Sequence, residues 1–212
     1  MGKGNRNKRA KKAPSSSKRW PEGMLLEAVL AVGDVFGNSA DCVRAAALLK
    51  ETARHLGYAL KVRPVSVVAQ HAPSNTLAVM GPLATGLLTE EQRAQSENHL
   101  PDGKDNGHLV LTCENPRLLI DANLRQLAVS GFEAPSMVVR INSTNPESGG
   151  WVAKPGDWTI NYALDEGNHA LIADFDGVIR DLASKANYLA SQLKKGETAA
   201  TLYGQLQIIK PV

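Results

Sequence analysis

Residues 38–60 of this 212-residue chain, NSADCVRAAALLKETARHLGYAL, carry the pattern that decides the fold class. Ser39 or Asp41 can cap a helix that begins at Cys42, and Leu56 followed by Gly57 ends it. The alanine-rich face of this helix predicts close packing on a sheet. The stretch 58–70 is rich in β-branched residues and predicts a strand. A helix followed directly by a strand favours an α+β domain.

A second stretch, GHLVLTCENPRLLID at 107–121, predicts a hairpin of strands 108–113 and 118–121. A two-residue loop places His108 opposite Asp121, and a four-residue loop makes the two residues diagonal neighbours. Both registers put the imidazole and the carboxylate on one face, whereas a three-residue loop separates them. Cys113 lies an odd number of residues from His108, so it points to the other face.

The remaining pattern predicts helices first, then an antiparallel sheet, then a C-terminal helix. From His71 to Asn106 the pattern weakens to a long loop with one short helix, and a loop of this length favours a lid or substrate loop. Between 145 and 156 we expect a Gly/Pro-rich loop. The other expected elements are helices at 21–36, 89–97 and 178–194, strands at 137–141 and 158–164, and an edge strand at 205–209.

The charge of the chain is unevenly distributed. Eight of the 24 basic residues lie within the first 19 positions, which contain no acidic residue, so the remainder carries a net charge of −5. We expect residues 1–19 to form a disordered basic tail and 20–212 a single domain. The tail predicts either weak nucleic-acid contact through residues 3–19, an anionic-surface contact or address signal, or simply a solubilising extension.

Several classes of protein are disfavoured. No apolar run approaches the roughly 20 residues that span a bilayer, and the N-terminus lacks the apolar stretch of a signal peptide. Two cysteines are too few for a disulfide scaffold, so we expect reduced thiols in a cytoplasmic protein. Neither a metal-ligand spacing nor a phosphate-binding glycine loop is present, and we expect no metal and no cofactor.

Cys42, His108 and Asp121 are the candidate catalytic residues. A thiol in the first turn of a helix lies at the positive end of the helix dipole, which favours the thiolate, and nearby backbone N–H groups can hold an oxyanion. Each residue also has a plainer interpretation: a small buried cysteine, a structural histidine, or an aspartate that caps a turn. Trp151, Trp158 and Tyr162 either line a substrate cleft or belong to the core.

Taken together, these motifs resemble the papain-like, transglutaminase-like superfamily of cysteine enzymes. The resemblance covers about residues 38–127: Cys42 opens a helix, Gly107-His108 a strand, and Asp121 ends the next strand. It implies a papain-like fold and a Cys-His-Asp triad. It also implies an oxyanion hole made by the backbone N–H of Cys42, with Asn38 and Gln70 as candidate side-chain donors.

The resemblance implies a cysteine-dependent enzyme that acts on an acyl bond of a protein, peptide or other amide through a thioester. Peptidase, amidase or deamidase, and transglutaminase-type transfer all stay open. The alternative is a non-catalytic binding module of the same fold, tethered to nucleic acid by the basic tail. A third hypothesis joins the two: an enzyme whose substrate is itself bound to nucleic acid.

Overall fold

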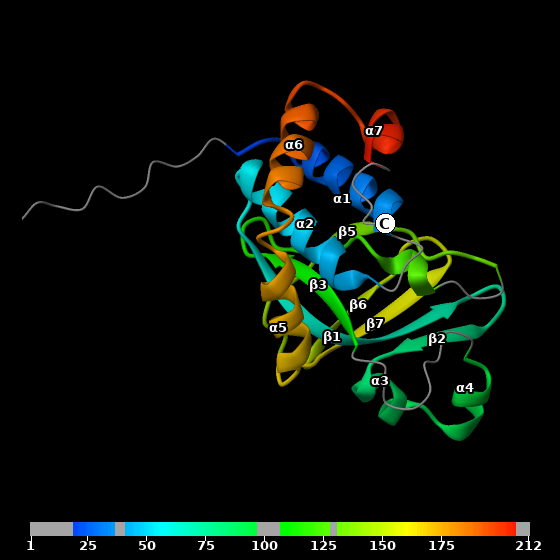
Figure 1. The fold of residues 1–212 in the computed structure, drawn as a ribbon. Helices are drawn as coiled ribbons and strands as arrows, with labels where there is room; N and C mark the ends of the chain where they lie inside the picture. Colours follow the sequence, from blue (N-terminus) through cyan, green and yellow to red (C-terminus); the bar gives the residue numbers. More distant parts are fainter. Residues whose placement is uncertain (1–18, 37–40, 97–106, 128–130, 207–212) are drawn as a thin grey trace, which may run out of the picture.

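The computed structural model describes residues 19–36, 41–96, 107–127 and 131–206 and confirms the α+β class (Figure 1). Residues 1–18 lie outside this part, so the predicted basic tail stays a prediction. The helices are α1 Glu22–Phe36, α2 Cys42–His55, α3 Pro82–Leu87, α4 Glu90–Ala94, the one-turn 3-10 helix η1 Leu124–Leu127, α5 His169–Val178, α6 Ala183–Lys194 and α7 Ala199–Leu206. The strands are β1 Leu60–His71, β2 Thr76–Met80, β3 His108–Cys113, β4 Leu118–Asp121, β5 Met137–Arg140, β6 Gly150–Ala153 and β7 Trp158–Leu164.

The strands form one antiparallel sheet that curls into a half-barrel, in the order β5-β4-β3-β1-β7-β6. The long strand β1 is its axis. One edge of β1 pairs with β7, and the other edge pairs first with β3, up to Val65, and then with β2, from Val67 onward. The neighbours of β1 therefore change between Val65 and Val67, and His108 lies at this change because it pairs with Val65.

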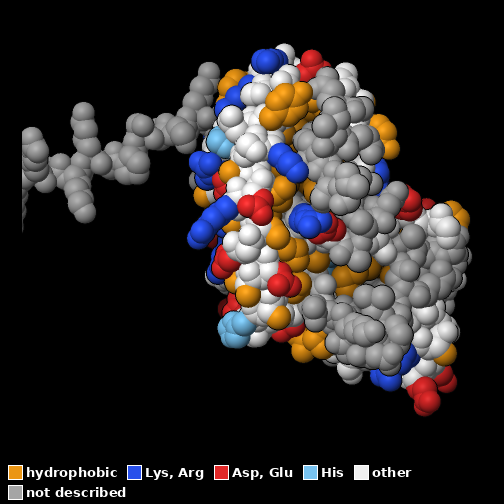
Figure 2. Space-filling view, viewed as in Figure 1, with side chains coloured by type: hydrophobic (Ala, Val, Ile, Leu, Met, Phe, Trp, Pro, Cys, Tyr) orange, Lys and Arg blue, Asp and Glu red, His pale blue; other side chains and the backbone are white. Residues whose placement is uncertain are grey.

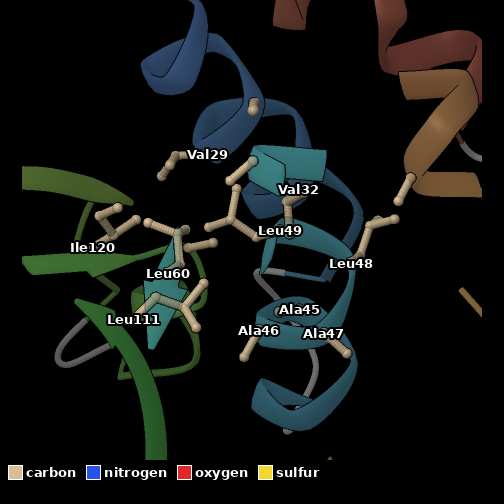
Figure 3. Close-up of a cluster of buried hydrophobic side chains, with 14 of the residues drawn as sticks. Val29, Val32, Ala45, Ala46, Ala47, Leu48, Leu49, Leu60, Leu111 and Ile120 are labelled. Carbon is tan, nitrogen blue, oxygen red and sulfur yellow. The ribbon is translucent and has the colours of Figure 1, made fainter. Parts of the chain in front are cut away.

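The helical layer covers the outer face of β3 and β4. Helix α2 packs against α1, α5 and α6, and α6 also contacts α1 (Figure 1). In Figure 3, Leu49 of α2 points toward Leu60 of the sheet, and Leu111 and Ile120 lie beside Leu60. Each buried aliphatic side chain stabilises the fold by roughly 1.5–3 kcal/mol relative to exposure, so this interface holds α2 on the sheet.

The helical layer also joins helices that are far apart in the sequence. Helix α7 packs on α1, and the backbone N–H of Ala199 donates to the Glu27 carboxylate at 2.7 Å.

A second apolar cluster fills the inner face of the half-barrel. Its members include Val65, Val67, Val110, Leu119, Trp151, Trp158, Ile160 and Tyr162, together with Leu124 and Leu127 of η1.

The prediction for residues 71–106 was wrong over its first part. The structure places strand β2 at Thr76–Met80, where we expected a loop, and Pro82 begins α3. The short helix predicted near 89–97 is present as α4, with Thr89 as its N-cap in a capping box with Gln92. Residues 97–106 lie outside the described part, so the lid hypothesis stays a prediction.

Three further predictions need correction. The expected 145–156 loop contains strand β6, which pairs with β7. The helix expected at 178–194 is present as α6 but begins later, at Ala183, and α5, which ends at Val178, was not predicted. The strand expected at 205–209 is wrong at its start, because 205 and 206 belong to α7; residues 207–209 lie outside the described part. Among the described residues, no helix is long and apolar enough to cross a membrane.

Candidate functional site

The site begins at the N-terminus of α2. The side chain of Asp41 caps this helix by accepting from the backbone N–H of Arg44 at 3.3 Å, and its other oxygen accepts from the Arg44 guanidinium at 3.2 Å. Of the two predicted caps, Asp41 is therefore the one confirmed. Cys42 becomes the first helical residue, and its side chain is almost fully buried. A thiol at this position lies beside backbone N–H groups that have no acceptor within the helix.

His108 is placed by the glycine before it. Gly107 has a φ of +90°, and a Cβ atom there would lie 2.9 Å from the carbonyl oxygen of Val65. Only glycine allows the backbone to turn this close to β1 before it continues as β3. The imidazole of His108 is completely buried and points to the inner face of the sheet.

Asp121 is held on the same face as His108. The hairpin has the four-residue loop, because Cys113 pairs with Leu118, so Asp121 is the diagonal neighbour of His108. Its Oδ2 accepts from the ring Nε2 of His108 at 2.8 Å. Of the loop lengths that the sequence left open, the four-residue loop is the one observed, and Cys113 lies on the opposite face as predicted, within the core under the helices.

Two more groups satisfy the Asp121 carboxylate. The hydroxyl of Tyr162 donates to Oδ2 at 3.1 Å, and the backbone N–H of Asn123 donates to Oδ1 at 3.0 Å. Burial, and after it the charge of Asp121, raises the pKa of Tyr162 well above its usual value, so this hydroxyl stays a donor. Three donors therefore satisfy both oxygens of this buried carboxylate. Tyr162 thus belongs to the site as well as to the core.

Cys42 lies near the His108 ring, because its side chain is among the groups that shift the pKa of this imidazole. Burial alone lowers the pKa of His108. The charge and hydrogen bond of Asp121, with the smaller contribution of Cys42, outweigh burial and raise this pKa to about 10. An imidazolium between a carboxylate and a sulfur is therefore strongly stabilised.

Gln126 is a neighbour that the sequence analysis missed. It lies on η1, and its Nε2 is 2.8 Å from Nδ1 of His108. No local sequence signal marks this contact, because it depends on how η1 folds back over the inner face of the sheet. The Leu124 and Leu127 side chains, both fully buried, hold η1 there.

Of the two side chains predicted to complete the oxyanion hole, one can be placed in the structure. Gln70 does not reach the site: it lies five residues beyond Val65 on β1, on the opposite face by strand alternation, and its amide donates to Asn75 at 2.7 Å. The prediction that Gln70 donates to the oxyanion hole was therefore wrong. Asn38 lies outside the described residues. The backbone N–H of Cys42 stays a candidate donor.

Trp151 and Trp158 are buried and belong to the inner apolar cluster. Across the described ranges, no group of three or more His, Cys, Asp and Glu residues could hold a metal ion.

Comparisons of this chain with protein-family models, with curated proteins and with solved structures find no match.

Proposed function

We propose that this protein is a cysteine-dependent acyl-bond enzyme of papain-like fold, in which Cys42 is the nucleophile, His108 the general base and acid, and Asp121 the residue that orients the ring. One observation supports this proposal above all: the buried imidazole of His108, which Cys42 is near enough to influence, has its Nε2 2.8 Å from the buried carboxylate of Asp121. Nucleophile, base and orienting group in that order are what thiol-based acyl transfer requires.

The proposed reaction has two steps. The thiolate attacks the carbonyl carbon, and the bond to the leaving amine breaks while that amine takes the proton from Nδ1 of His108, which leaves a thioester on Cys42. Water or a second amine then attacks the thioester, Nδ1 accepts the proton of this nucleophile, and the proton returns to sulfur. The backbone N–H of Cys42 is the proposed oxyanion donor.

A direct test compares the alkylation of the two cysteines by iodoacetamide between pH 5 and 9, with peptide mass spectrometry as the readout. We expect Cys42 to react at least about tenfold faster than Cys113 at neutral pH, because only a thiolate reacts. In urea the two rates should converge. Equal rates in the folded protein would count against the proposal.

A second test looks for the covalent intermediate. Incubation with p-nitrophenyl acetate should give an acetyl adduct on the Cys42 peptide that hydroxylamine removes, as expected for a thioester. The Cys42→Ala variant should give no such adduct. An adduct that persists in this variant would place the nucleophile elsewhere.

The alternative function concerns the basic tail. On the face shown in Figure 2, Lys, Arg, Asp and Glu side chains are interspersed over the helical layer, so the described part of this face does not gather one sign of charge. Nucleic-acid contact through residues 3–19 therefore stays a prediction about the tail alone, and a cytoplasmic location likewise stays a prediction. Filter binding of the full chain and of a chain that starts at Trp20, across a salt series, tests this contact.

A further inference from the structure

The helical layer as a whole mixes both signs of charge, but one end of it gathers basic side chains. At this end the last turns of α2 and α6 lie beside the segment that leads into α1 (Figure 1). Two hydrogen bonds fix that segment: the backbone N–H of Trp20 donates to the carbonyl oxygen of Leu56 at 3.0 Å, and the Tyr58 hydroxyl donates to the carbonyl oxygen of Trp20 at 2.7 Å. The point at which residues 1–18 join the fold is therefore defined.

Cationic groups from different segments meet around these two bonds. The guanidinium carbon of Arg19 lies 5.3 Å from the ring centroid of Tyr58, and Nζ of Lys194 lies 5.7 Å from that of Trp20. A cation held over an aromatic face keeps its charge and gains a fixed position. These two charges are thus placed on the fold by contacts that leave them available to an anion.

His55, in the last turn of α2, reports the sign of the charge around it. The guanidinium of Arg54 is 3.3 Å from Nε2 of His55 and is paired with Glu51 at 2.8 Å. Burial, and after it the charge of Arg54, lowers the pKa of His55; Glu51 opposes this shift, and Lys194 adds to it. Because Lys194 belongs to α6, the ends of both helices contribute to one positive region.

We call the cationic side chains of this region the tail-root cluster: Arg19, Arg54, Lys194 and Lys195. Apart from Arg54, none of them forms an ion pair within the described ranges. Basic residues near the C-terminal end of a helix also balance the helix dipole, which accounts for Arg54 and Lys194. It does not account for Arg19, which lies outside any described helix and directly follows the seven basic residues of 1–18.

We propose that the tail-root cluster and residues 1–18 together bind single-stranded nucleic acid, and that the cluster holds the strand at a fixed place on the fold. Four cations of the cluster continue the seven of 1–18, and a flexible phosphate backbone can follow both. Residues 1–19 contain no aromatic and, apart from Met1, no large apolar side chain that could enter a bilayer, which favours nucleic acid over a lipid surface. The inference is independent of the proposed function, because no member of the cluster contacts His108 or Asp121.

The test measures fluorescence anisotropy of a single-stranded oligonucleotide of about 20 nucleotides with the full chain, at about 50 to 200 mM salt. Lys194→Gln/Lys195→Gln removes two exposed charges and keeps good helix-forming side chains. We expect about tenfold weaker binding and a slope of log affinity against log salt that is smaller by about 1.4, since each phosphate contact contributes about 0.7. Arg93→Gln/Lys154→Gln is the matched control: it removes the same charge from α4 and from the residue after β6, and it should leave the slope unchanged.

A second measurement locates the strand on the fold. In NMR spectra of the full chain, the ring signals of His55 should shift on addition of the oligonucleotide, and its pKa should rise because phosphate opposes the effect of Arg54 and Lys194. His169, at the start of α5, should be unaffected.

Equal slopes in the wild type and in the lysine variant, with unchanged signals of His55, would mean that residues 1–18 bind alone and would overturn the inference. Failure to bind the oligonucleotide would also overturn it, as would binding only to vesicles of phosphatidylserine. None of these outcomes bears on the alkylation of Cys42, so the proposed function is judged separately.

Discussion

The two cysteines of this chain are a natural comparison, because both are free, both are buried, and they differ in their neighbours. Cys42 is 7% exposed and lies near enough to His108 to raise its pKa, and His108 is itself paired with Asp121. Cys113 is 2% exposed, and its S–H donates to the carbonyl of Asn115 at 3.4 Å. Burial raises the pKa of Cys113, which keeps it a thiol. The comparison teaches that a basic partner, rather than exposure, distinguishes a candidate nucleophile from a core thiol.

The largest expected difference comes from removing each thiol. Cys42→Ala should lower acyl transfer by at least about 10³-fold, because the nucleophile is lost. Cys113→Ala should leave the rate within about twofold and lower the free energy of unfolding by about 1 kcal/mol, a cost comparable to that of removing one buried methyl group. Adduct formation from p-nitrophenyl acetate and urea unfolding measure the two effects. Similar losses of rate in both variants would contradict the assignment of Cys42, rather than Cys113, as the nucleophile.

The next effect tests what makes Cys42 different. Asp121→Asn removes the charge that favours the imidazolium, so alkylation and acyl transfer at Cys42 should fall about 10²- to 10⁴-fold toward the behaviour of Cys113. An undiminished rate would mean that Asp121 does not act on the site.

The same variant should change the pH dependence of stability. His108 holds its proton more tightly in the folded chain, with a pKa of about 10, than in the unfolded chain, where the pKa is 6.5. This contribution is complete below pH 6.5 and is lost as the pH rises to about 10, so the free energy of unfolding should fall across that window. Urea titrations from pH 6 to 10 should show this decline in the wild type, and the decline should be much weaker in Asp121→Asn.

A smaller effect is expected from the backbone that places His108. Gly107→Ala forces an alanine into a left-handed conformation with its Cβ atom 2.9 Å from the Val65 carbonyl oxygen, and it should cost about 1–3 kcal/mol of unfolding free energy. Alkylation of Cys42 should slow, and that of Cys113 should not. Gly167→Ala is the control, because a Cβ atom there meets nothing within 4 Å. Equal thermal stability of the two variants would contradict this account.

The smallest expected effect comes from Tyr162, which donates a hydrogen bond to Asp121. Tyr162→Phe removes one of the three donors to Asp121 and should cost about 1 kcal/mol, with a slowing of Cys42 alkylation of no more than about fivefold. Tyr203→Phe, on the exposed side of α7, should change neither quantity. Thermal unfolding and alkylation rates measure both variants.

Much of the region around Cys42 could be predicted because its signals are local. An N-cap before Cys42, a glycine after Leu56 and the two-residue period of β3 and β4 are each read within a few positions of the chain. The strand period places His108 and Asp121 on one face for either even-length loop, and the structure supplies the loop length. The papain-like assignment rests on the order of these short pieces and stays a proposal.

The remaining features depend on contacts between distant residues. Tyr162 reaches Asp121 from 41 positions away, and the contact of Gln126 with His108 depends on where η1 folds. Strand β6 was missed because its Gly/Pro-rich setting masks a four-residue strand that forms only when β7 pairs with it. The assignment of Gln70 failed because residue type alone says nothing about which face of a strand a side chain occupies.

The contact between Glu27 and the start of α7 has a consequence for biosynthesis. Helix α1 leaves the ribosome early, but the helix that packs on it is among the last described segments to be made. Until then, apolar surface of α1 is without its native cover, and chains of this size with exposed apolar surface are prone to associate during synthesis. The helical layer is thus complete only after α7 has been made, which makes α7 a determinant of yield as well as of stability.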